Sequence, residues 1–197
     1  MRQPLTREAI SKAARDLLVA EGLHAVSLRR VANILGVTAP ALYAHVVDKR
    51  DLLQGIAEQE IESLLARFRE IRHDDPVERM RAMCDGYVDY GVRNPDLFRA
   101  IFLFRPELTS EARGERGALT AAIHDAFIEA ALAIARGHEV GDTEAKLAAL
   151  TVWTAAHGVV TVLLSGPPLD IELQSRLADA TISAAITGLR HGALAAA

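Results

Sequence analysis

Apolar residues recur along this chain every three to four positions, which is the spacing of one face of an α-helix. Alternation over every second residue, which is typical of a half-buried strand, is not found. The most informative stretch is 28–45, where two short helical patterns flank Gly36. The first of these patterns places four apolar residues on one face: Leu28, Val31, Ala32 and Leu35.

This stretch predicts a helix-turn-helix. Gly36 favours the backbone conformation in which helices often end, and Thr38 can cap the next helix through its hydroxyl. Pro40 is tolerated in the first turn, because the amide it lacks has no partner there. The second helix is therefore short, and its N-terminal turn has the form that enters a DNA major groove. Leu42 and Val46 are expected to face the core of this unit.

The rest of the chain also predicts helices, so the fold class is all-α. A first helix begins after Thr6 and ends at Gly22, and a longer one runs from Lys49 to near His73. Further helices are expected over 77–92, 96–104, 118–136, 142–164 and 170–191. Two charged, glycine-containing stretches, 113–117 and 137–141, are expected to be mobile loops.

Charge divides the chain unevenly. The net charge is −4, but residues 1–54 carry eight Lys or Arg against five acidic residues, a net +3, and the remainder carries −7. This asymmetry favours an N-terminal module that approaches phosphates. The N-terminus carries no apolar signal segment, which indicates a cytoplasmic protein with no membrane partner. Cys84 is the only cysteine, so we expect a buried apolar side chain, with a redox-sensing thiol as the alternative.

The last two predicted helices have wide apolar faces rich in small residues. Such faces need more than one neighbour, which predicts a homodimer interface built from these helices. A purely internal core is the alternative. The small residues are Ala155, Ala156, Gly158, Ala178, Ala180, Ala184, Ala185 and Gly188.

Residues 6–53 resemble the DNA-binding domain of the TetR family of transcriptional regulators. The resemblance lies in Gly22, Val26–Arg29, Leu35–Val37, Pro40–Tyr43, His45 and Lys49–Leu53. A second element, Trp153, His157 and Gly158 followed by Leu163–Gly166, resembles the C-terminal domain of the TetR branch named for its Trp-His-Gly (WHG) motif. The resemblance implies a helix-turn-helix domain over 1–48 and a helical effector-binding and dimerisation domain over 49–197.

The resemblance also implies DNA contacts. Small groups at the start of the second helix can touch bases, a guanidinium can bind guanine or phosphate, and hydroxyl, phenol, imidazole and ammonium groups can bind phosphates. Because Ala39, Ala41 and Ala44 are all alanine, specificity depends on Arg29 and on DNA shape. The alternatives are a packed ring for Tyr43 and a helix cap for His45. The expected contacts are Ser27, Arg29, Thr38, Ala39, Pro40, Ala41, Tyr43, His45 and Lys49.

A cavity for a small, mostly apolar effector is implied in the C-terminal region. Trp153 and His157 are four residues apart, so they share a helix face that His124 could meet. Ordinary core packing is the alternative for all of these side chains. The candidate ligand-binding residues are Tyr87, Tyr90, Phe98, Phe102, His124, Phe127, Trp153 and His157.

The sequence therefore predicts a homodimeric transcriptional regulator, a repressor by resemblance, that binds a pseudo-palindromic double-stranded operator and responds to a small-molecule effector. No metal-binding or nucleophile motif is present, so we expect no catalytic residues, no metal and no cofactor. A helical interaction protein or a small helical enzyme that does not read DNA is the alternative.

Overall fold

The computed structural model describes residues 4–103, 110–134 and 141–189, without the side chains of residues 103 and 110–120. Every regular element in these ranges is a helix, so the predicted all-α fold class is confirmed. The chain packs into two compact units. Unit 1 comprises Met1–Ser63 and Asn94–Gly117, and unit 2 comprises Leu64–Arg93 and Ala118–Ala197.

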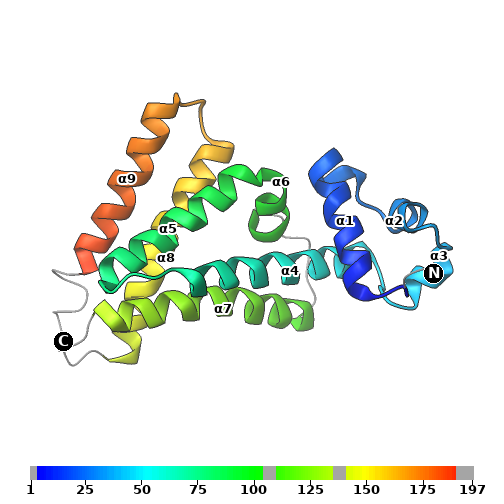
Figure 1. Ribbon diagram of the computed structural model, residues 1–197, viewed down its shortest axis with the longest axis horizontal. Coiled ribbons are helices and arrows are strands. Elements are labelled where there is room, and N and C mark those ends of the chain that lie inside the picture. Colours follow the sequence, from blue (N-terminus) through cyan, green and yellow to red (C-terminus); the bar gives the residue numbers. More distant parts are fainter. Residues whose placement is uncertain (1–3, 104–109, 135–140, 190–197) are drawn as a thin grey trace. The chain divides into compact units, whose positions relative to one another are not determined.

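Unit 1 is built around the N-terminal helices, labelled in Figure 1. Helix α1 packs against α2 and α6, and α2 packs against α3. As predicted, the Thr6 hydroxyl caps α1 by accepting from the Ala9 amide at 3.1 Å, and Gly22 follows the last turn with φ +83°. The elements are α1 (Arg7–Glu21), η1 (Leu23–Ala25), α2 (Leu28–Leu35), α3 (Ala39–Tyr43), α4 (Lys49–Glu70, shared with unit 2), α6 (Pro95–Phe98) and the π-helical turn η2 (Arg99–Leu103).

The core of the N-terminal helices is apolar and closely packed. Leu42 is fully buried and Val46 is 2% exposed, which confirms that both face inward. Burying a side chain of this size stabilises a domain by about 1.5–3 kcal/mol. Alpha3 is only five residues long, and Leu42 is the residue that packs it against the core. The other large buried side chains here include Ile10, Leu18, Val31, Leu52 and Ile56.

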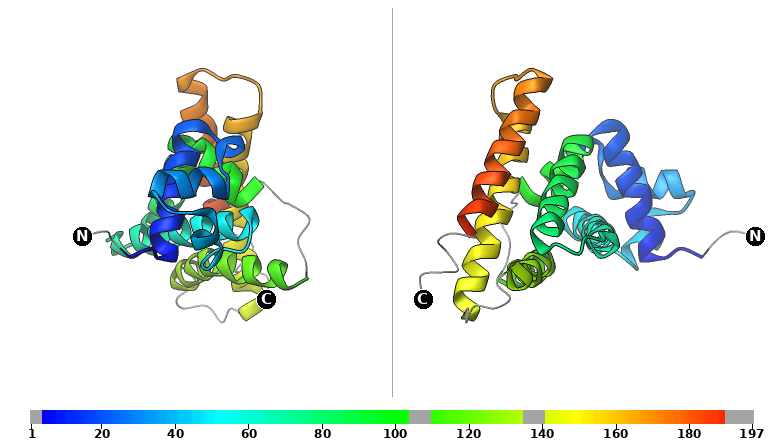
Figure 2. Two further views of the ribbon diagram at one scale, coloured as in Figure 1. Left: turned by 90° about the vertical axis from the view of Figure 1, so that its right-hand side faces the viewer. Right: turned by 60° about the vertical axis from the view of Figure 1, so that its left-hand side comes forward.

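Unit 2 contains α5 (Pro76–Arg93), α8 (Asp142–Ser165) and α9 (Ile171–Gly188), with parts of α4 and α7 (Ser110–Ile134). Alpha5 packs against α8 and α9, and α8 and α9 lie side by side (Figures 1 and 2). Arg81 joins α5 to α9, because its guanidinium donates to Ser183 Oγ at 2.8 Å and pairs with Asp179 at 2.5 Å.

Two predictions about the middle of the chain need correction. Helix α7 begins at Ser110, so residues 113–117 are helical and not a loop. Each glycine there lowers helix propensity by about 1 kcal/mol, but the neighbouring Ala, Glu and Arg residues are strong helix formers. The predicted helix over 96–104 is a short α-helix that continues as η2. The second predicted loop and the other predicted helix ends fall on residues 104, 135–140, 190 and 191. These residues lie outside the described ranges.

Two further side-chain and helix properties bear on function. Cys84 is fully buried as expected, and burial raises its thiol pKa to about 12, so the thiol stays protonated. In the described part of the chain, α8 alone is long and apolar enough to cross a membrane, with a mean hydropathy of 1.8. Alpha8 packs against α5 and α9, but only 33% of its most apolar window is buried.

Candidate functional site

The turn between α2 and α3 has the geometry that the sequence predicted. Gly36 adopts the left-handed conformation (φ +64°, ψ +31°), and the Val37 amide donates to Ala32 O at 3.0 Å. This pair of features forms a Schellman ending, which satisfies carbonyls that the helix leaves open. The Thr38 hydroxyl then accepts from the Ala41 amide at 3.4 Å and starts α3. A tight turn thus separates α2 from α3. The residues that cap the two helices, Gly36 and Thr38, lie within this turn.

The first turn of α3 is accessible from outside unit 1. Thr38 and Pro40 are exposed, whereas Ala39 and Ala41 are half-buried. Tyr43 is 58% exposed and His45 is exposed. One face of α3 therefore holds Leu42 in the core while the opposite face is free for a ligand as large as a nucleic acid.

Two adjacent arginines at the start of α2 differ in their surroundings. The Arg30 guanidinium forms a bidentate ion pair with Glu21, in which its two terminal nitrogens donate to the two carboxylate oxygens at 2.8 and 2.6 Å. This pairing raises the pKa of Arg30 and lowers that of Glu21. Arg29 is exposed and has no ion pair or hydrogen bond to any residue that the structure describes. Only Arg29 is therefore available to an external anion without breaking an existing contact.

Two of the other predicted DNA-contact residues, Ser27 and Lys49, also form hydrogen bonds within the protein. The Ser27 hydroxyl caps α2 by accepting from the Arg30 amide at 3.3 Å. Its proton, like that of Thr38, can still be donated outward. The Lys49 ammonium donates to the Leu23 carbonyl at 3.1 Å, which ties the start of α4 to η1. Lys49 therefore has an internal role in addition to any contact with a phosphate.

In unit 2, one tyrosine, one tryptophan and two histidines form a cluster, and within it Trp153 and His157 share a face of α8, as their spacing predicted. The Trp153 ring lies 4.8 Å from the His157 ring on α8, and 4.5 Å from the His124 ring of α7. The Tyr87 hydroxyl of α5 lies 2.9 Å from His157 Nδ1. We call Tyr87, His124, Trp153 and His157 the aromatic cluster.

Two polar atoms of the aromatic cluster are buried without a partner. Among the described residues, neither Trp153 Nε1 nor His124 Nε2 has a neighbour in hydrogen-bonding geometry. Burial lowers the pKa of both His124 and His157 and raises that of Tyr87. The cluster is therefore neutral at pH 7 and can offer hydrogen-bond donors. Buried groups without partners are uncommon and often mark a place where a ligand or water binds.

The other candidate ligand residues lie elsewhere. Tyr90 is 4% exposed in α5, and Phe127 packs edge-on against Phe68 at 5.8 Å within unit 2. The Phe98 and Phe102 rings, in α6 and η2 of unit 1, lie 4.9 Å apart and are tilted by 42°. The structure thus brings together four of the eight predicted residues in the aromatic cluster, and packs the others against different neighbours.

Two protein-family models match this chain, one in its N-terminal part and one in its C-terminal part. Residues 10–56, which contain the helix-turn-helix, match the model described as bacterial regulatory proteins, tetR family. Residues 80–187, more than half of the chain, match a tetracyclin repressor-like C-terminal domain. The chain belongs to the TetR family.

Relatives and solved structures agree with this assignment. An uncharacterized HTH-type transcriptional regulator of Mycobacterium tuberculosis, Rv0681, is 25% identical over 184 residues, covering 89% of this chain and 78% of the relative. BioQ, solved with its natural double-stranded DNA operator, is similar with a TM-score of 0.65 and 24% identity, over 95% of this chain and 99% of BioQ. ActR of Streptomyces coelicolor, in complex with (S)-DNPA, has a TM-score of 0.70 and 21% identity, over 97% and 100%.

As a TetR family member, the chain is a DNA-binding transcriptional regulator and not an enzyme. One residue that stabilises the DNA-binding part of this TetR regulator was not predicted. Arg7, at the start of α1, donates to the His45 carbonyl at 3.2 Å and pairs with Asp51 at 2.5 Å. Asp51 also accepts from the Val47 amide at 2.8 Å. The segment that follows α3 is thus held by two residues from different helices. No sequence signal identifies this contact, because Arg7 and His45 are 38 positions apart.

We expect Asp51→Asn to destabilise the regulator by about 1 kcal/mol at pH 7, because charge-assisted hydrogen bonds to Arg7 and Val47 are weakened. The hydrogen bond from the Arg7 guanidinium holds the pKa of Asp51 below its ordinary value of 3.8. A carboxyl whose pKa is lowered by folding stabilises the folded state above its unfolded pKa and loses this contribution as pH falls through the folded pKa. The difference between the two proteins should therefore shrink below about pH 3.8. Urea unfolding at pH 7 and pH 3 measures it, and a constant difference would contradict this assignment.

A second pH effect arises in the aromatic cluster. Because folding lowers the pKa of His157, the unfolded chain takes up a proton more readily once pH falls below about 6.5. The regulator should therefore lose stability between pH 7.5 and pH 5, and His157→Gln should reduce that loss. Thermal unfolding across this range measures the effect, with exposed His73→Gln as the matched control. Equal pH dependence in wild type and His157→Gln would show that His157 takes no part.

Proposed function

We propose that this TetR regulator is a repressor that binds a pseudo-palindromic operator as a homodimer and is released by a small, mostly apolar effector. The observation that carries the DNA part is the exposed first turn of α3, capped by Thr38 and flanked by the unpaired cation of Arg29. Repression is taken from the family, whose C-terminal model is described as tetracyclin repressor-like.

The proposed DNA contacts are those expected from the sequence, and the functional division falls between 1–48 and 49–197. Arg29 is the candidate for reading a base, since an unpaired guanidinium can bind guanine with two hydrogen bonds. Tyr43, His45 and Lys49 are proposed phosphate contacts. The set is completed by Ser27, Thr38, Ala39, Pro40 and Ala41.

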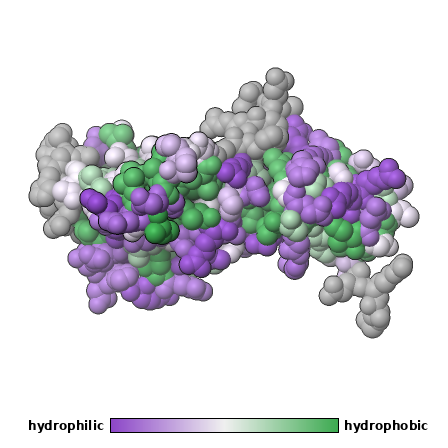
Figure 3. All heavy atoms as spheres, turned by 90° about the horizontal axis from the view of Figure 1, so that it is seen from above, coloured by the Kyte–Doolittle hydropathy of each residue, from purple (hydrophilic) through white to green (hydrophobic). Residues whose placement is uncertain are grey.

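The open side of α8 and α9 supports the proposed homodimer. A shallow groove of about 430 Å³ runs between these helices, lined mostly by apolar and small residues. Only 33% of the most apolar window of α8 is buried, although its mean hydropathy is 1.8. An exposed apolar surface of this kind favours a protein partner. Figure 3 shows, on one face, hydrophobic residues in green lying among hydrophilic ones in purple. The groove residues are Thr151, Thr154, Ala155, Gly158, Val159, Val162, Leu177, Thr181 and Ala185.

A dimer has the symmetry that the operator requires. Two copies related by a two-fold axis carry two α3 helices, which can enter successive major grooves when these lie about 34 Å apart or somewhat more. Each half-site is then read by one copy, and the two half-sites repeat each other in opposite directions. This is the reason for proposing a pseudo-palindrome.

The aromatic cluster is the proposed effector site. An effector with an acceptor atom could bind Trp153 Nε1 or His124 Nε2, while its apolar body meets the rings. The motif of Trp153, His157 and Gly158 also supports a place in the WHG branch of the family. The remaining candidates for this site are Tyr87, Tyr90, Phe98, Phe102 and Phe127. By linkage, an effector that binds the DNA-free conformation more tightly lowers DNA affinity by the same factor.

We also propose a cytoplasmic location, because a regulator of this kind acts where the DNA is. Selection of genomic DNA fragments by the purified protein tests the proposed function. We expect the selected fragments to share an inverted repeat, with affinity that falls steeply as salt rises, because bound phosphates release counterions. Selected fragments without a common repeat, or binding that salt does not affect, would contradict it.

A further inference from the structure

The first turn of α2 carries two adjacent arginines, of which Glu21 neutralises one. Arg29 and Arg30 both follow the Ser27 cap, and this turn contains no acidic residue. Because a helix N-terminus already carries partial positive charge, two cations there attract anions strongly. Glu21, the last residue of α1, gives its carboxylate to Arg30. Within the ranges that the structure describes, Arg29 has no such partner.

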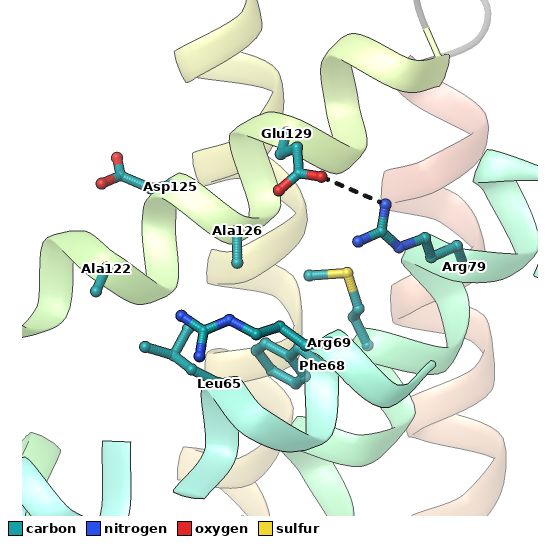
Figure 4. A pocket seen from close by; sticks show the side chains of 9 residues that line it. Leu65, Phe68, Arg69, Arg79, Ala122, Asp125, Ala126 and Glu129 are labelled. Atoms are coloured by element: carbon teal, nitrogen blue, oxygen red, sulfur yellow. Dashed lines mark ion pairs between the residues drawn. The ribbon is translucent and has the colours of Figure 1, made fainter. Parts of the chain in front are cut away.

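The pair of Glu21 and Arg30 has the geometry of a strong surface ion pair. Both terminal nitrogens of Arg30 donate, one to each carboxylate oxygen, at 2.8 and 2.6 Å. The single contact of 3.6 Å between Arg79 and Glu129, drawn in Figure 4, is the weaker arrangement. Two parallel hydrogen bonds fix the direction of the Arg30 guanidinium as well as balancing its charge. The side chains of Arg30 and Glu21 are nevertheless 45% and 48% exposed, so the pair lies where DNA can compete for Arg30.

The pair also lies beside two groups that we propose to bind phosphates. The Ser27 hydroxyl accepts from the backbone amide of Arg30 itself, at 3.3 Å. The Lys49 ammonium donates to the carbonyl of Leu23, two residues after Glu21. Without Glu21, Arg30 would therefore add a second free cation beside these groups. With Glu21 in place, the carboxylate both occupies Arg30 and repels phosphates.

We propose that Glu21 is a specificity-determining residue, which keeps Arg30 from binding phosphate so that the first turn of α2 binds DNA through Arg29. Binding to unrelated DNA comes almost wholly from phosphate contacts, whereas operator binding adds contacts with bases. Base contacts fix the position of α2 on the operator, but a complex without them can shift until every free cation meets a phosphate. Occupying Arg30 therefore weakens the wrong complexes more than the right one, which raises specificity. This inference rests on the proposed DNA contacts of α2, and not on the dimer or the effector.

Glu21→Gln tests the proposal, because it removes the charge and keeps the size of the side chain. The probe is a labelled duplex of scrambled sequence, and fluorescence anisotropy measures its affinity between about 50 and 200 mM salt. We expect this affinity to rise about fivefold, and its logarithmic salt dependence to become steeper by about one unit, as for one added phosphate contact. Affinity for the selected operator should rise less, so that the ratio of the two affinities falls.

The double variant Glu21→Gln with Arg30→Ala separates the freed guanidinium from a general effect of charge. It has the net charge of the wild type, so the scrambled duplex should bind with wild-type affinity and salt dependence. Glu62→Gln is the matched control, because Glu62 is exposed and its replacement changes the net charge as Glu21→Gln does. Glu62 lies about 20 Å along α4 from Lys49, which is beyond the screening length of about 10 Å at 0.1 M salt. We therefore expect Glu62→Gln to bind as the wild type does.

Three results would overturn the proposal: unchanged binding of the scrambled duplex by Glu21→Gln, an equal gain in Glu62→Gln, or a gain that persists in the double variant. Thermal unfolding of each variant is measured in parallel. An ion pair that only stabilises the fold would give Glu21→Gln a lower melting temperature and no gain in DNA affinity. A wild-type protein that selects no inverted repeat would contradict the proposed function, whereas the scrambled duplex would still decide whether Glu21 keeps Arg30 from phosphate.

Discussion

Val162→Glu is expected to convert the proposed dimer into monomers and to lower operator affinity about a hundredfold or more. Val162 lies in the groove between α8 and α9 and is 42% exposed in the single chain, so a glutamate there stays solvated when the protein is monomeric. In a two-fold dimer the substitution occurs twice in one interface. Burying carboxylates without partners costs several kcal/mol, and each 1.4 kcal/mol is a tenfold loss of affinity.

Val92→Glu is the matched control for this experiment. Val92 is 41% exposed on α5 and does not line the groove, so its replacement adds the same charge at nearly the same exposure. Sedimentation velocity measures the oligomeric state, and a gel-shift titration measures operator affinity. We expect Val92→Glu to remain dimeric and active. A Val162→Glu protein that still forms dimers and binds the operator normally would show that the dimer uses another surface.

Arg29→Ala is expected to weaken operator binding by about 1–3 kcal/mol, roughly ten- to a hundredfold, with little change in stability. The guanidinium of Arg29 has no partner among the described residues, so its removal leaves no buried group unpaired. If Arg29 reads a guanine, the loss will be largest on the best operator and small on unrelated DNA. If it binds a phosphate, affinity will fall on all sequences and the salt dependence will decrease.

The neighbouring Arg30 provides a stringent control, because it has the same charge and a nearly identical position in the sequence. Its guanidinium is already held by Glu21 at 2.8 and 2.6 Å. We therefore expect Arg30→Ala to have a much smaller effect on operator affinity than Arg29→Ala. Fluorescence anisotropy with a labelled operator compares the two variants. Equal losses would mean that net charge, and not the free guanidinium, determines binding.

The helix-turn-helix could be predicted in detail because its determinants are local. Gly36 ends α2 with a positive φ, Thr38 starts α3, and Leu42 is buried, and each of these follows from residues within one or two helical turns. The pairing of Trp153 with His157 was also predictable, since residues four apart share a helix face. Local rules failed at 113–117, where two glycines indicated a loop but strong helix formers on both sides keep the segment helical.

Distant contacts could not be predicted in this way. The choice between Arg29 and Arg30 depends on Glu21, which lies in another helix, and the sequence contains no signal that one arginine is paired and the other is not. The contact between Arg7 and the His45 carbonyl has the same character. It brings together groups from separate parts of the chain, and helical periodicity specifies which face of a helix is buried but not which residues that face contacts.

The sequence by itself determined the all-helical class and the turn at Gly36. These depend on backbone preferences and on the spacing of apolar residues, which act over a few positions. Only the tertiary structure decided which charged groups are already paired, which polar atoms of the aromatic cluster lack a partner, and where α8 leaves an open apolar side. The physical reason is that electrostatic pairing and desolvation depend on distances between atoms, and those distances are set when the helices pack.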